Sequence, residues 1–407
     1  MRPALPARAL FAWAVAGASA VTAVPARSEP ITTIPISSGL SVSSNPFLRE
    51  GAQAKSGQSV FLEAQPTIAW RTETSDVTLD GQVRVDRFLK TYRDDLSVRI
   101  GLAANQEVSE RTRVRAHASA RSARANGADV LLQNAGFGGP TIPSGSPEAP
   151  VLPDVSFGGL RGRTTTLEAE IGVNHAVDDY SALSFDLGTS LNRYKDSNSR
   201  DSRAANANAT FQRRLSERGS LDVSLEAVVV DYLGRREGDG FALSPTLGWQ
   251  QRLSSQTTFT VAAGLSLTRI TEPLGTHDST VSLAGRASLC SRGSRFDYCG
   301  RIDRSARPTS EGGLSSVLSA GVSGQFRLNR RDRIAMDASY GRSSEALLTG
   351  SRRTELAQAS MTLSREFDQR LSAFFTPSYT KSFREPVSPK ANFALRMGVR
   401  FRFGAIG

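Results

Sequence analysis

Apolar and polar residues alternate strictly along Phe393–Phe403, near the end of the 407-residue sequence. All odd positions of this segment are apolar, and all even positions are small or cationic. A repeat of two residues is the period of a β-strand, whose side chains point to opposite faces. Arginines on one face and large apolar groups on the other fit a wall between hydrocarbon and water better than a soluble sandwich. The segment is therefore predicted to be a membrane-spanning β-strand.

The same alternation recurs along the whole chain, at intervals of about 20 residues. A helix would instead place apolar residues at steps of three and four, and these segments do not. The clearest alternating segments are Val77–Val85, Leu96–Ala104, Val114–Ala120, Leu167–Val173, Leu183–Leu191, Leu221–Val229, Phe241–Trp249, Phe259–Leu267 and Leu318–Phe326.

Connections between these segments are alternately short and long. Short polar turns are expected at Val108–Thr112, Val177–Tyr180, Leu215–Gly219, Leu253–Gln256, Leu328–Asp332 and Phe367–Leu371, and longer loops around 196–203, 235–240, 274–278, 347–353 and 384–390. Short turns at one end and long loops at the other are typical of outer-membrane barrels, whose short turns are periplasmic. The predicted fold is all-β, a transmembrane antiparallel up-and-down β-barrel of about 18 strands, within a range of 16 to 18. A barrel whose chain starts and ends on the periplasmic side needs an even number of strands, so one further strand is required at the start. Ile36–Phe47 can supply it.

The N-terminus resembles a secretory signal. Arg2 and Arg8 precede an apolar run, Ala9–Val24, and small-residue cleavage sites follow it. A membrane anchor is the alternative, but this run is short for one and rich in Ala and Gly. We expect a signal peptide at 1–26, a periplasmic segment at 27–35, and a single barrel at 36–407. No later stretch approaches the ~20 apolar residues of a membrane helix.

The longest connection, Ala125–Arg163, is rich in Gly and Pro. A loop of this length is usually functional or mobile. It could fold into the mouth of the barrel and narrow it, or it could stay on the surface. Exposure is the preferred interpretation.

The net charge of +11 comes from arginines spread along alternating strands rather than gathered in one patch. Together with export, this distribution argues against a nucleic-acid partner. The basic residues predicted to line the pore are Arg84, Arg99, Arg113, Arg115, Arg121, Arg396, Arg400 and Arg402. The acidic residues predicted to line it are Glu168, Glu170, Asp186, Asp222 and Glu226. Opposed basic and acidic arcs would set up a transverse field that favours polar solutes. The alternative is ordinary solvated charges that pair with one another.

Cys290 and Cys299 bracket a predicted periplasmic hairpin. The periplasm is oxidising, so two cysteines this close can form a disulfide. Two free thiols, or a metal pair without its other ligands, are the alternatives, and the disulfide is preferred. The sequence shows no phosphate-cradling Gly loop and no metal-type cluster. We therefore expect no catalytic residue, no metal site, no cofactor and no enzymatic activity.

The chain resembles the outer-membrane β-barrel porins of proteobacteria that are often linked with exopolysaccharide gene clusters. The similarity lies in Gly39–Val42 followed by Ser44–Phe47, in Val60–Pro66 with Trp70, and in Val77–Phe88 and Leu96–Leu102. It covers nearly the whole mature chain, but it is one of style and spacing rather than of a catalytic signature. The resemblance implies a pore-like barrel in the outer membrane of a Gram-negative bacterium.

The function expected from these observations is a channel for passive passage of hydrophilic solutes, anions among them, with polysaccharide as a cargo implied only by the resemblance. The expected partners are outer-membrane lipid and lipopolysaccharide, the barrel-assembly machinery, and the transported polysaccharide or small solutes. The alternative is a plugged structural or adhesive barrel whose outer loops bind a partner or surface polysaccharide.

Overall fold

The structure is a computed structural model that describes residues 29–124, 163–195, 200–233, 238–271, 275–309, 313–344, 353–384 and 389–404. The expected signal peptide at 1–26 and nearly all of the Ala125–Arg163 connection lie outside these residues. The strands are β1 (Ile31–Ser43), β2 (Gly57–Ala64), β3 (Thr67–Arg71), β4 (Ser75–Phe88), β5 (Asp95–Ser109), β6 (Thr112–Arg124), β7 (Arg163–Ala176), β8 (Ser181–Tyr194), β9 (Ser202–Arg214), β10 (Gly219–Tyr232), β11 (Gly240–Arg252), β12 (Thr257–Thr271), β13 (His277–Arg292), β14 (Phe296–Pro308), β15 (Leu314–Arg327), β16 (Asp332–Ser344), β17 (Arg353–Glu366), β18 (Leu371–Arg384) and β19 (Asn392–Gly404). One short 3-10 helix, η1 (Gly51–Gln53), lies between β1 and β2. No helix within the described ranges is both long and apolar enough to cross a bilayer.

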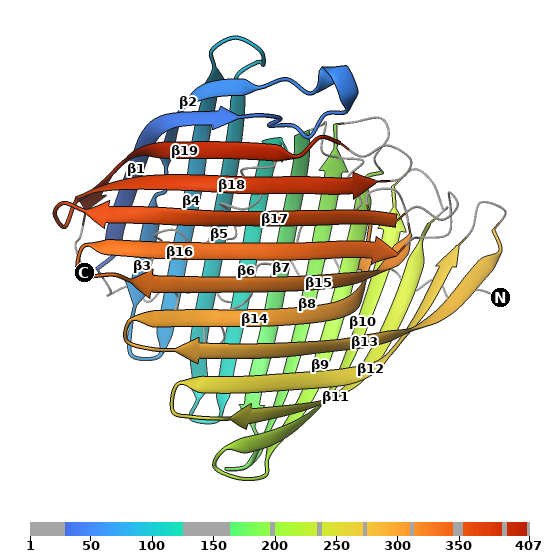
Figure 1. Ribbon diagram of the computed structural model, residues 1–407. Helices are drawn as coiled ribbons and strands as arrows, with labels where there is room; N and C mark the ends of the chain where they lie inside the picture. The colour runs from blue at the N-terminus through green and yellow to red at the C-terminus, as the bar shows by residue number, and fades with distance from the viewer. Residues whose placement is uncertain are drawn as a thin grey trace.

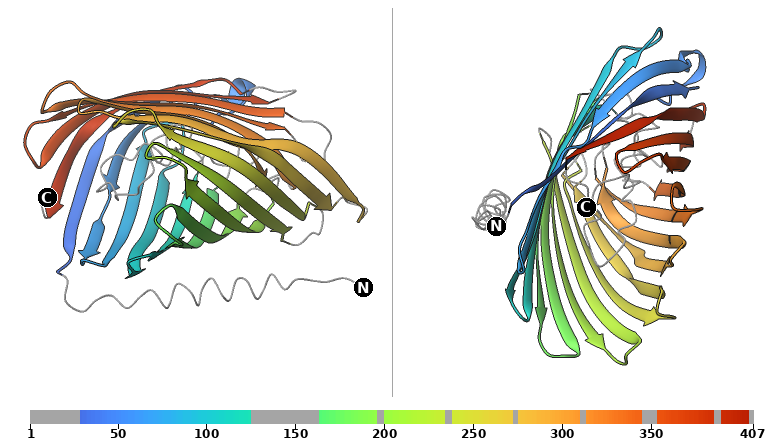
Figure 2. Two further views of the ribbon diagram at one scale, coloured as in Figure 1. Left: turned by 90° about the horizontal axis from the view of Figure 1, so that it is seen from below. Right: turned by 90° about the vertical axis from the view of Figure 1, so that its left-hand side faces the viewer.

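All strands belong to one antiparallel sheet that closes on itself, because β1 pairs with β19 from Thr33↔Gly404 to Ser43↔Ala394. Figures 1 and 2 show the resulting cylinder, in which the strands of the near wall cross those of the far wall steeply. Closure gives every strand a neighbour on both sides, which is the arrangement that a bilayer demands of a sheet.

Two of the labelled strands, β2 and β3, together occupy one strand position in the wall. Both pair with β1 and with β4, and the register does not change between them. They are separated at Pro66, which has no N–H to donate to a ladder but whose carbonyl still accepts from the Gly81 N–H at 2.8 Å. Counting β2 and β3 together gives a closed barrel of 18 strands, so the predicted architecture is confirmed.

The outward face of the wall is apolar along its length. On β1 Leu40 and Val42 are exposed, and on β4 Val83 and Val85 are exposed, while Arg84 between them is buried. On β19 the odd positions other than Leu395 are exposed and Arg396 is buried, as the alternation predicts. The outward side chains are apolar although no described residue covers them, and this is the signature of a lipid-facing surface.

The two ends of the barrel differ as expected. The predicted short turns join β5 to β6, β7 to β8, β9 to β10, β11 to β12, β15 to β16 and β17 to β18. In the last of these, Asp368 accepts hydrogen bonds from the N–H groups of Arg370 and Leu371, and these bonds hold the pKa of its carboxyl below the ordinary value. The two hydrogen bonds therefore stabilise the turn at pH values above the ordinary pKa, and this stabilisation is lost as the pH falls through the lowered pKa of Asp368.

One boundary differs from the sequence prediction. The first strand runs from Ile31 to Ser43 rather than from Ile36 to Phe47, so residues 31–35, expected in a periplasmic segment, belong to the wall. These residues pair with β3 on one side and with the end of β19 on the other. The wall extends this far because β19 and β3 both offer backbone partners there.

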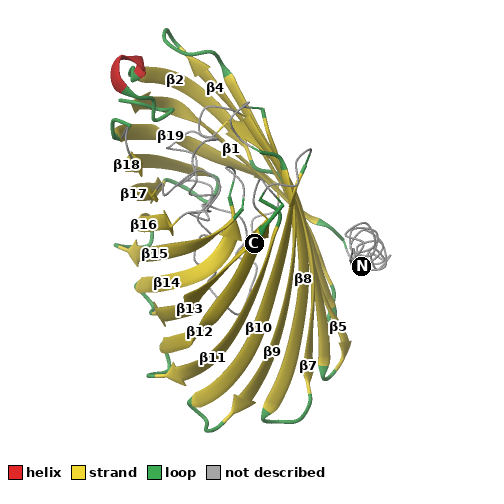
Figure 3. Ribbon diagram, turned by 90° about the vertical axis from the view of Figure 1, so that its right-hand side faces the viewer, coloured by secondary structure: helices red, strands yellow, loops and turns green. Residues whose placement is uncertain are grey.

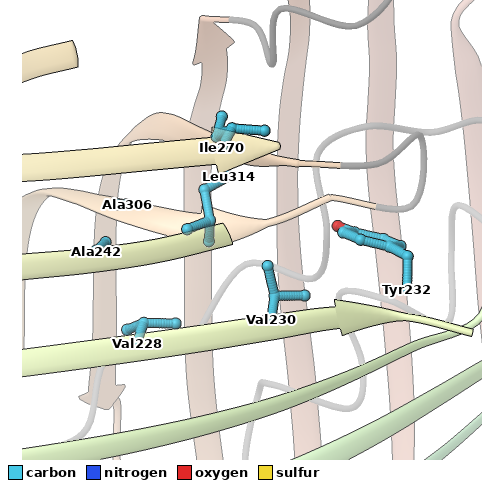
Figure 4. Packing of buried hydrophobic residues seen from close by; sticks show 7 residues of the cluster. All are labelled: Val228, Val230, Tyr232, Ala242, Ile270, Ala306 and Leu314. Atoms are coloured by element: carbon cyan, nitrogen blue, oxygen red, sulfur yellow. The ribbon is translucent and has the colours of Figure 1, made fainter. Parts of the chain in front are cut away.

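The outer ends of β14 and β15 leave the cylinder and bend inward (Figure 3). There β14 approaches β10 and β15 approaches β11, although these strands are far apart around the wall. Ala306 and Leu314 of the hairpin pack against Val230 and Ile270 in the main buried apolar cluster, which Figure 4 shows. The Tyr232 hydroxyl lies 2.6 Å from the Thr309 carbonyl oxygen and 2.9 Å from that of Gly313, and this contact fastens the hairpin to β10.

Cys290 and Cys299 face each other across β13 and β14 and are joined by a disulfide. The bond lies on the inward face, close to the short turn between these two strands. It joins the two strands at the end of the barrel opposite the inward-bent hairpin.

We expect Gly398→Val to prevent normal closure. Gly398 pairs with Gly39 at the β1–β19 seam, and a Cβ at Gly398 would clash with the Ser38 carbonyl and lie 3.0 Å from Phe374 Cζ. Overpacking of this kind costs about 1–3 kcal/mol or more. Heat-modifiable gel mobility should show a reduced folded fraction, whereas Val399→Ala on the exposed neighbouring position should fold normally. Equal folded fractions for the two variants would contradict the steric role of the seam.

Candidate functional site: the inward face of the barrel

The inward face is polar, and the side chains predicted to line the pore all lie on it. Each alternates with an outward apolar neighbour on its own strand: Arg84 on β4, Arg99 on β5, Arg113, Arg115 and Arg121 on β6, Glu168 and Glu170 on β7, Asp186 on β8, Asp222 and Glu226 on β10, and Arg396, Arg400 and Arg402 on β19. The strands of the basic group are neighbours once β19 meets β1, and those of the acidic group follow them around the wall.

A buried cluster lies where β19, β1, β2 and β4 meet. Arg396 of β19 donates to Glu63 of β2 at 2.6 Å across β1. Arg84 of β4 makes two bonds to Asp86 at 2.7 Å each. Both guanidinium groups lie over the ring of Phe61, at 4.0 Å for Arg396 and 5.2 Å for Arg84. Cations over an aromatic face are attracted by its quadrupole, so Phe61 holds two like charges together.

A second group of ion pairs is far more exposed. Arg115 of β6 lies 2.6 Å from Asp186 of β8, and its side chain keeps 56% of its accessible surface. Arg113 pairs with Glu107 at the inner surface near the β5–β6 turn, and Arg99 lies 4.0 Å from Asp80. Side chains that point inward and stay half exposed are not packed against the opposite wall. Among the described residues, nothing packs over these side chains, and they stay accessible to solvent.

Two of the predicted arginines stand apart from carboxylates. Arg400 donates to the Ser37 hydroxyl at 3.1 Å and lies 5.9 Å from the ring of Phe374. Within the described ranges, neither Arg400 nor Arg402 has a carboxylate oxygen within 4.0 Å. Both lie near the short-turn end of β19, where they leave an excess of positive charge on the inward face.

The acidic side of the wall also has partners. Asp222 lies 3.7 Å from Arg286 of β13, and Glu226 interacts electrostatically with Arg307 and Asp303 of β14. Arg307 and Asp303 are themselves 3.2 Å apart. Glu168 accepts from the Ser119 hydroxyl at 3.3 Å.

Sequence reasoning thus missed the counter-charges of both arcs. Glu63, Asp80 and Asp86 form ion pairs with arginines of the basic arc. In the acidic arc, Arg286 pairs with Asp222, and Arg307 interacts electrostatically with Glu226. Glu63 sits in the run Val60-Phe61-Leu62-Glu63, in which no alternation reveals the face of each side chain. Pairing within and between the arcs is the arrangement expected from the alternative interpretation, in which ordinary solvated charges pair with one another. The transverse field stays a prediction.

Of the comparisons with known proteins, the one with solved structures finds similarities. No protein-family model matches the sequence. No curated protein matches it either. Among solved structures, similarity is found to OccK2 (OpdF) of Pseudomonas aeruginosa, with a TM-score of 0.46, 10% identity, and coverage of 93% of this chain and 99% of that one. OccAB4 of Acinetobacter baumannii gives a TM-score of 0.45, 8% identity and coverage of 93% and 100%. The FrpB iron transporter of Neisseria meningitidis (F5-1 variant) gives 0.44, 7%, and 93% and 83%. At these scores the similarities carry no argument about function.

We expect Glu63→Gln to destabilise the barrel strongly. The substitution leaves Arg396, whose side chain is 10% exposed, without its carboxylate. Removing one partner of a buried ion pair typically costs about 3–5 kcal/mol. Urea titration of the barrel folded in lipid vesicles, followed by tryptophan fluorescence, measures the loss.

The matched control is Glu107→Gln, which removes the carboxylate of an exposed pair on the same face of the barrel. An exposed pair is worth about 1 kcal/mol or less, so this variant should unfold close to the unmodified protein. If both variants lose the same stability, the buried cluster does not have the role assigned to it.

Proposed function

We propose that the protein is a porin-like channel of the outer membrane that lets small hydrophilic solutes pass passively and favours anions. One observation carries the proposal. A closed 18-strand wall has an apolar outward face, and its inward face carries charged side chains that stay half exposed. Barrels of this size are too wide for their own side chains to fill.

The preference for anions follows from the position of the unbalanced charge. Most of the inward arginines are compensated by carboxylates, but Arg400 and Arg402 add positive charge near the short-turn end of β19. Rings or clusters of arginine at a pore lining favour anions over cations. Polysaccharide as a cargo rests only on the resemblance of the sequence to exopolysaccharide-linked porins.

The second candidate is a plugged structural or adhesive barrel. It is favoured by the β14–β15 hairpin, which bends inward and is fastened to β10 through Tyr232. Such a hairpin narrows the outer end of the interior. The two candidates differ in whether ions cross the barrel.

Conductance across a planar lipid bilayer distinguishes the two candidates. The channel should give steady single-channel steps whose current is proportional to voltage. Insertion without current, with the protein recovered in its heat-modifiable form, would support the plugged barrel and contradict the channel.

Charge reversal at Arg400 and Arg402 tests the source of the selectivity. The double substitution Arg400→Glu and Arg402→Glu should shift the zero-current potential in a KCl gradient toward cation preference. The shift should be large at 0.1 M KCl and small at 1 M, because the Debye length falls from about 10 Å to about 3 Å. Arg87→Glu, on the exposed outward face of β4, is the control and should leave the potential unchanged. An unchanged potential in the double variant would exclude Arg400 and Arg402 as the source.

A further inference from the structure

The wall of the barrel is incomplete between β13 and β14. Their ladder runs from Arg292↔Asp297 to Gly285↔Arg304 and stops there. The partner ladders continue, since β12 pairs with β13 as far as His277 and β15 pairs with β14 as far as Pro308. Figure 3 shows β14 bending into the barrel at this point while β13 stays in the wall. Within the described part of the chain, no strand pairs with the edge of β13 between His277 and Ala284.

Part of this gap lies at the level of the hydrocarbon. The outward positions of β12 and β13 are apolar at Leu265↔Leu283 and Leu267↔Val281, and they turn polar at Arg269↔Ser279. The apolar band of the wall therefore ends between Val281 and Ser279. Residues 281–284 have an unpaired edge within that band, although an open sheet edge in hydrocarbon is costly.

Arg304 lies where the β13–β14 ladder ends and the gap begins. It shares a face of β14 with Ile302, which is exposed on the outside of the barrel, and it is opposite Gly285, which has no side chain to shield it. Gly285 lies deeper in the apolar band than Val281 and Leu283. Arg304 is therefore a partly exposed cation at the point where β13 and β14 separate, at the depth of the apolar band.

Nothing negative in the described residues compensates this cation. The Arg304 Nε donates to the Ser316 hydroxyl at 3.1 Å, and no carboxylate of the described ranges lies within 4.0 Å. An arginine that faces lipid destabilises a barrel to an extent that depends on its depth in the bilayer. Ionisable groups at such depth usually mark a functional site with a partner.

The sides of the gap fit the two ends of an amphiphile. The outward side is apolar, with Leu283, Val281 and Ile302 all more than half exposed. The inward side is polar, with Arg286 and Asp303 facing the interior. The gap is held open because Ala306 and Leu314 anchor the bent hairpin in the apolar cluster on β10–β12 (Figure 4).

We propose that the gap between β13 and β14 is a binding site for an anionic amphiphile, with a phosphate group on Arg304 and an acyl chain along Leu283 and Ile302. The phosphate supplies the negative charge that Arg304 lacks, and its oxygens accept charge-assisted hydrogen bonds from the guanidinium. The acyl chain covers the apolar flanks and shields the unpaired edge of β13 from the surrounding bilayer. Membrane location is the sole premise, so the site does not depend on whether the barrel conducts.

Native mass spectrometry of the detergent-solubilised barrel tests the site, with dilauroyl phosphatidylglycerol as the probe. The unmodified protein should retain this lipid, and Arg304→Gln should weaken its binding about tenfold, which is the effect of losing one charge-assisted bond. Gln can still donate to the Ser316 hydroxyl, so the variant removes the charge while keeping that contact. Heat-modifiable mobility verifies that each variant is folded.

Arg87→Gln is the matched control, because Arg87 of β4 shares the outward face with Val60 of β2 and is more exposed than Arg304, but it lies away from the gap. It should bind the lipid as the unmodified protein does, and Arg304→Lys should bind at an intermediate level. Equal binding by the Arg304→Gln and Arg87→Gln variants would overturn the proposal.

Two further probes separate the headgroup from the chain. A neutral galactosyl diacylglycerol of the same chain length should bind weakly and should not distinguish the variants; strong binding that ignores Arg304 would overturn the role of the phosphate. Inorganic phosphate at millimolar concentration should fail to displace the lipid. Full displacement would mean that a free anion suffices, and would overturn the amphiphile.

A phosphatidylglycerol with a photoactivatable group in its acyl chain locates the chain directly. Cross-links should concentrate on peptides that contain 281–284 and 302–306. Labelling spread evenly around the outward face of the barrel would contradict a site at the gap.

Discussion

The structure depends on one constraint, which is that every backbone N–H and C=O group at membrane depth needs a partner. The seam between β1 and β19 meets this constraint over Thr33–Ser43 and turns a long sheet into a cylinder. The paired glycines Gly39 and Gly398 let the two backbones approach closely, and Gly398 also leaves room for the ring of Phe374. Because the seam joins the two ends of the sequence, the barrel closes only when nearly the whole chain is in place.

Much of the fold could be predicted from the sequence, because lipid on one side and water on the other impose the same repeat of two on each strand. The repeat is clearest where large apolar residues alternate with charges, as on β4 and β19. It is weak on β9, where Ala205, Ala207 and Ala209 occupy the central outward positions, so the sequence indicates this strand only through the loop and the turn that flank it. The inward bend of β14 and β15 could not be predicted, since it results from contacts of Ala306 and Leu314 with strands distant in sequence.

The inward residues were predictable as a class, but their pairing was not. Alternation places Arg396 and Arg84 on the inward face, yet it says nothing of how far each strand is staggered against the next. That stagger decides that Arg396 meets Glu63 across β1 and that Phe61 lies beneath two guanidinium groups. A pattern along one strand fixes a face, whereas a charge pair depends on register between strands. The electrostatic character of the interior therefore had to come from the structure.

The disulfide between Cys290 and Cys299 has a mechanical consequence for the barrel wall. It crosses the same pair of strands that separate further out, and it lies at the opposite end of their shared ladder. The hydrogen-bonded ladder between the two strands spans only Gly285–Arg292 of β13. The disulfide prevents the strands from separating along this ladder as far as the periplasmic end. The barrel can thus keep the gap between β13 and β14 in its outer half without opening into a flat sheet.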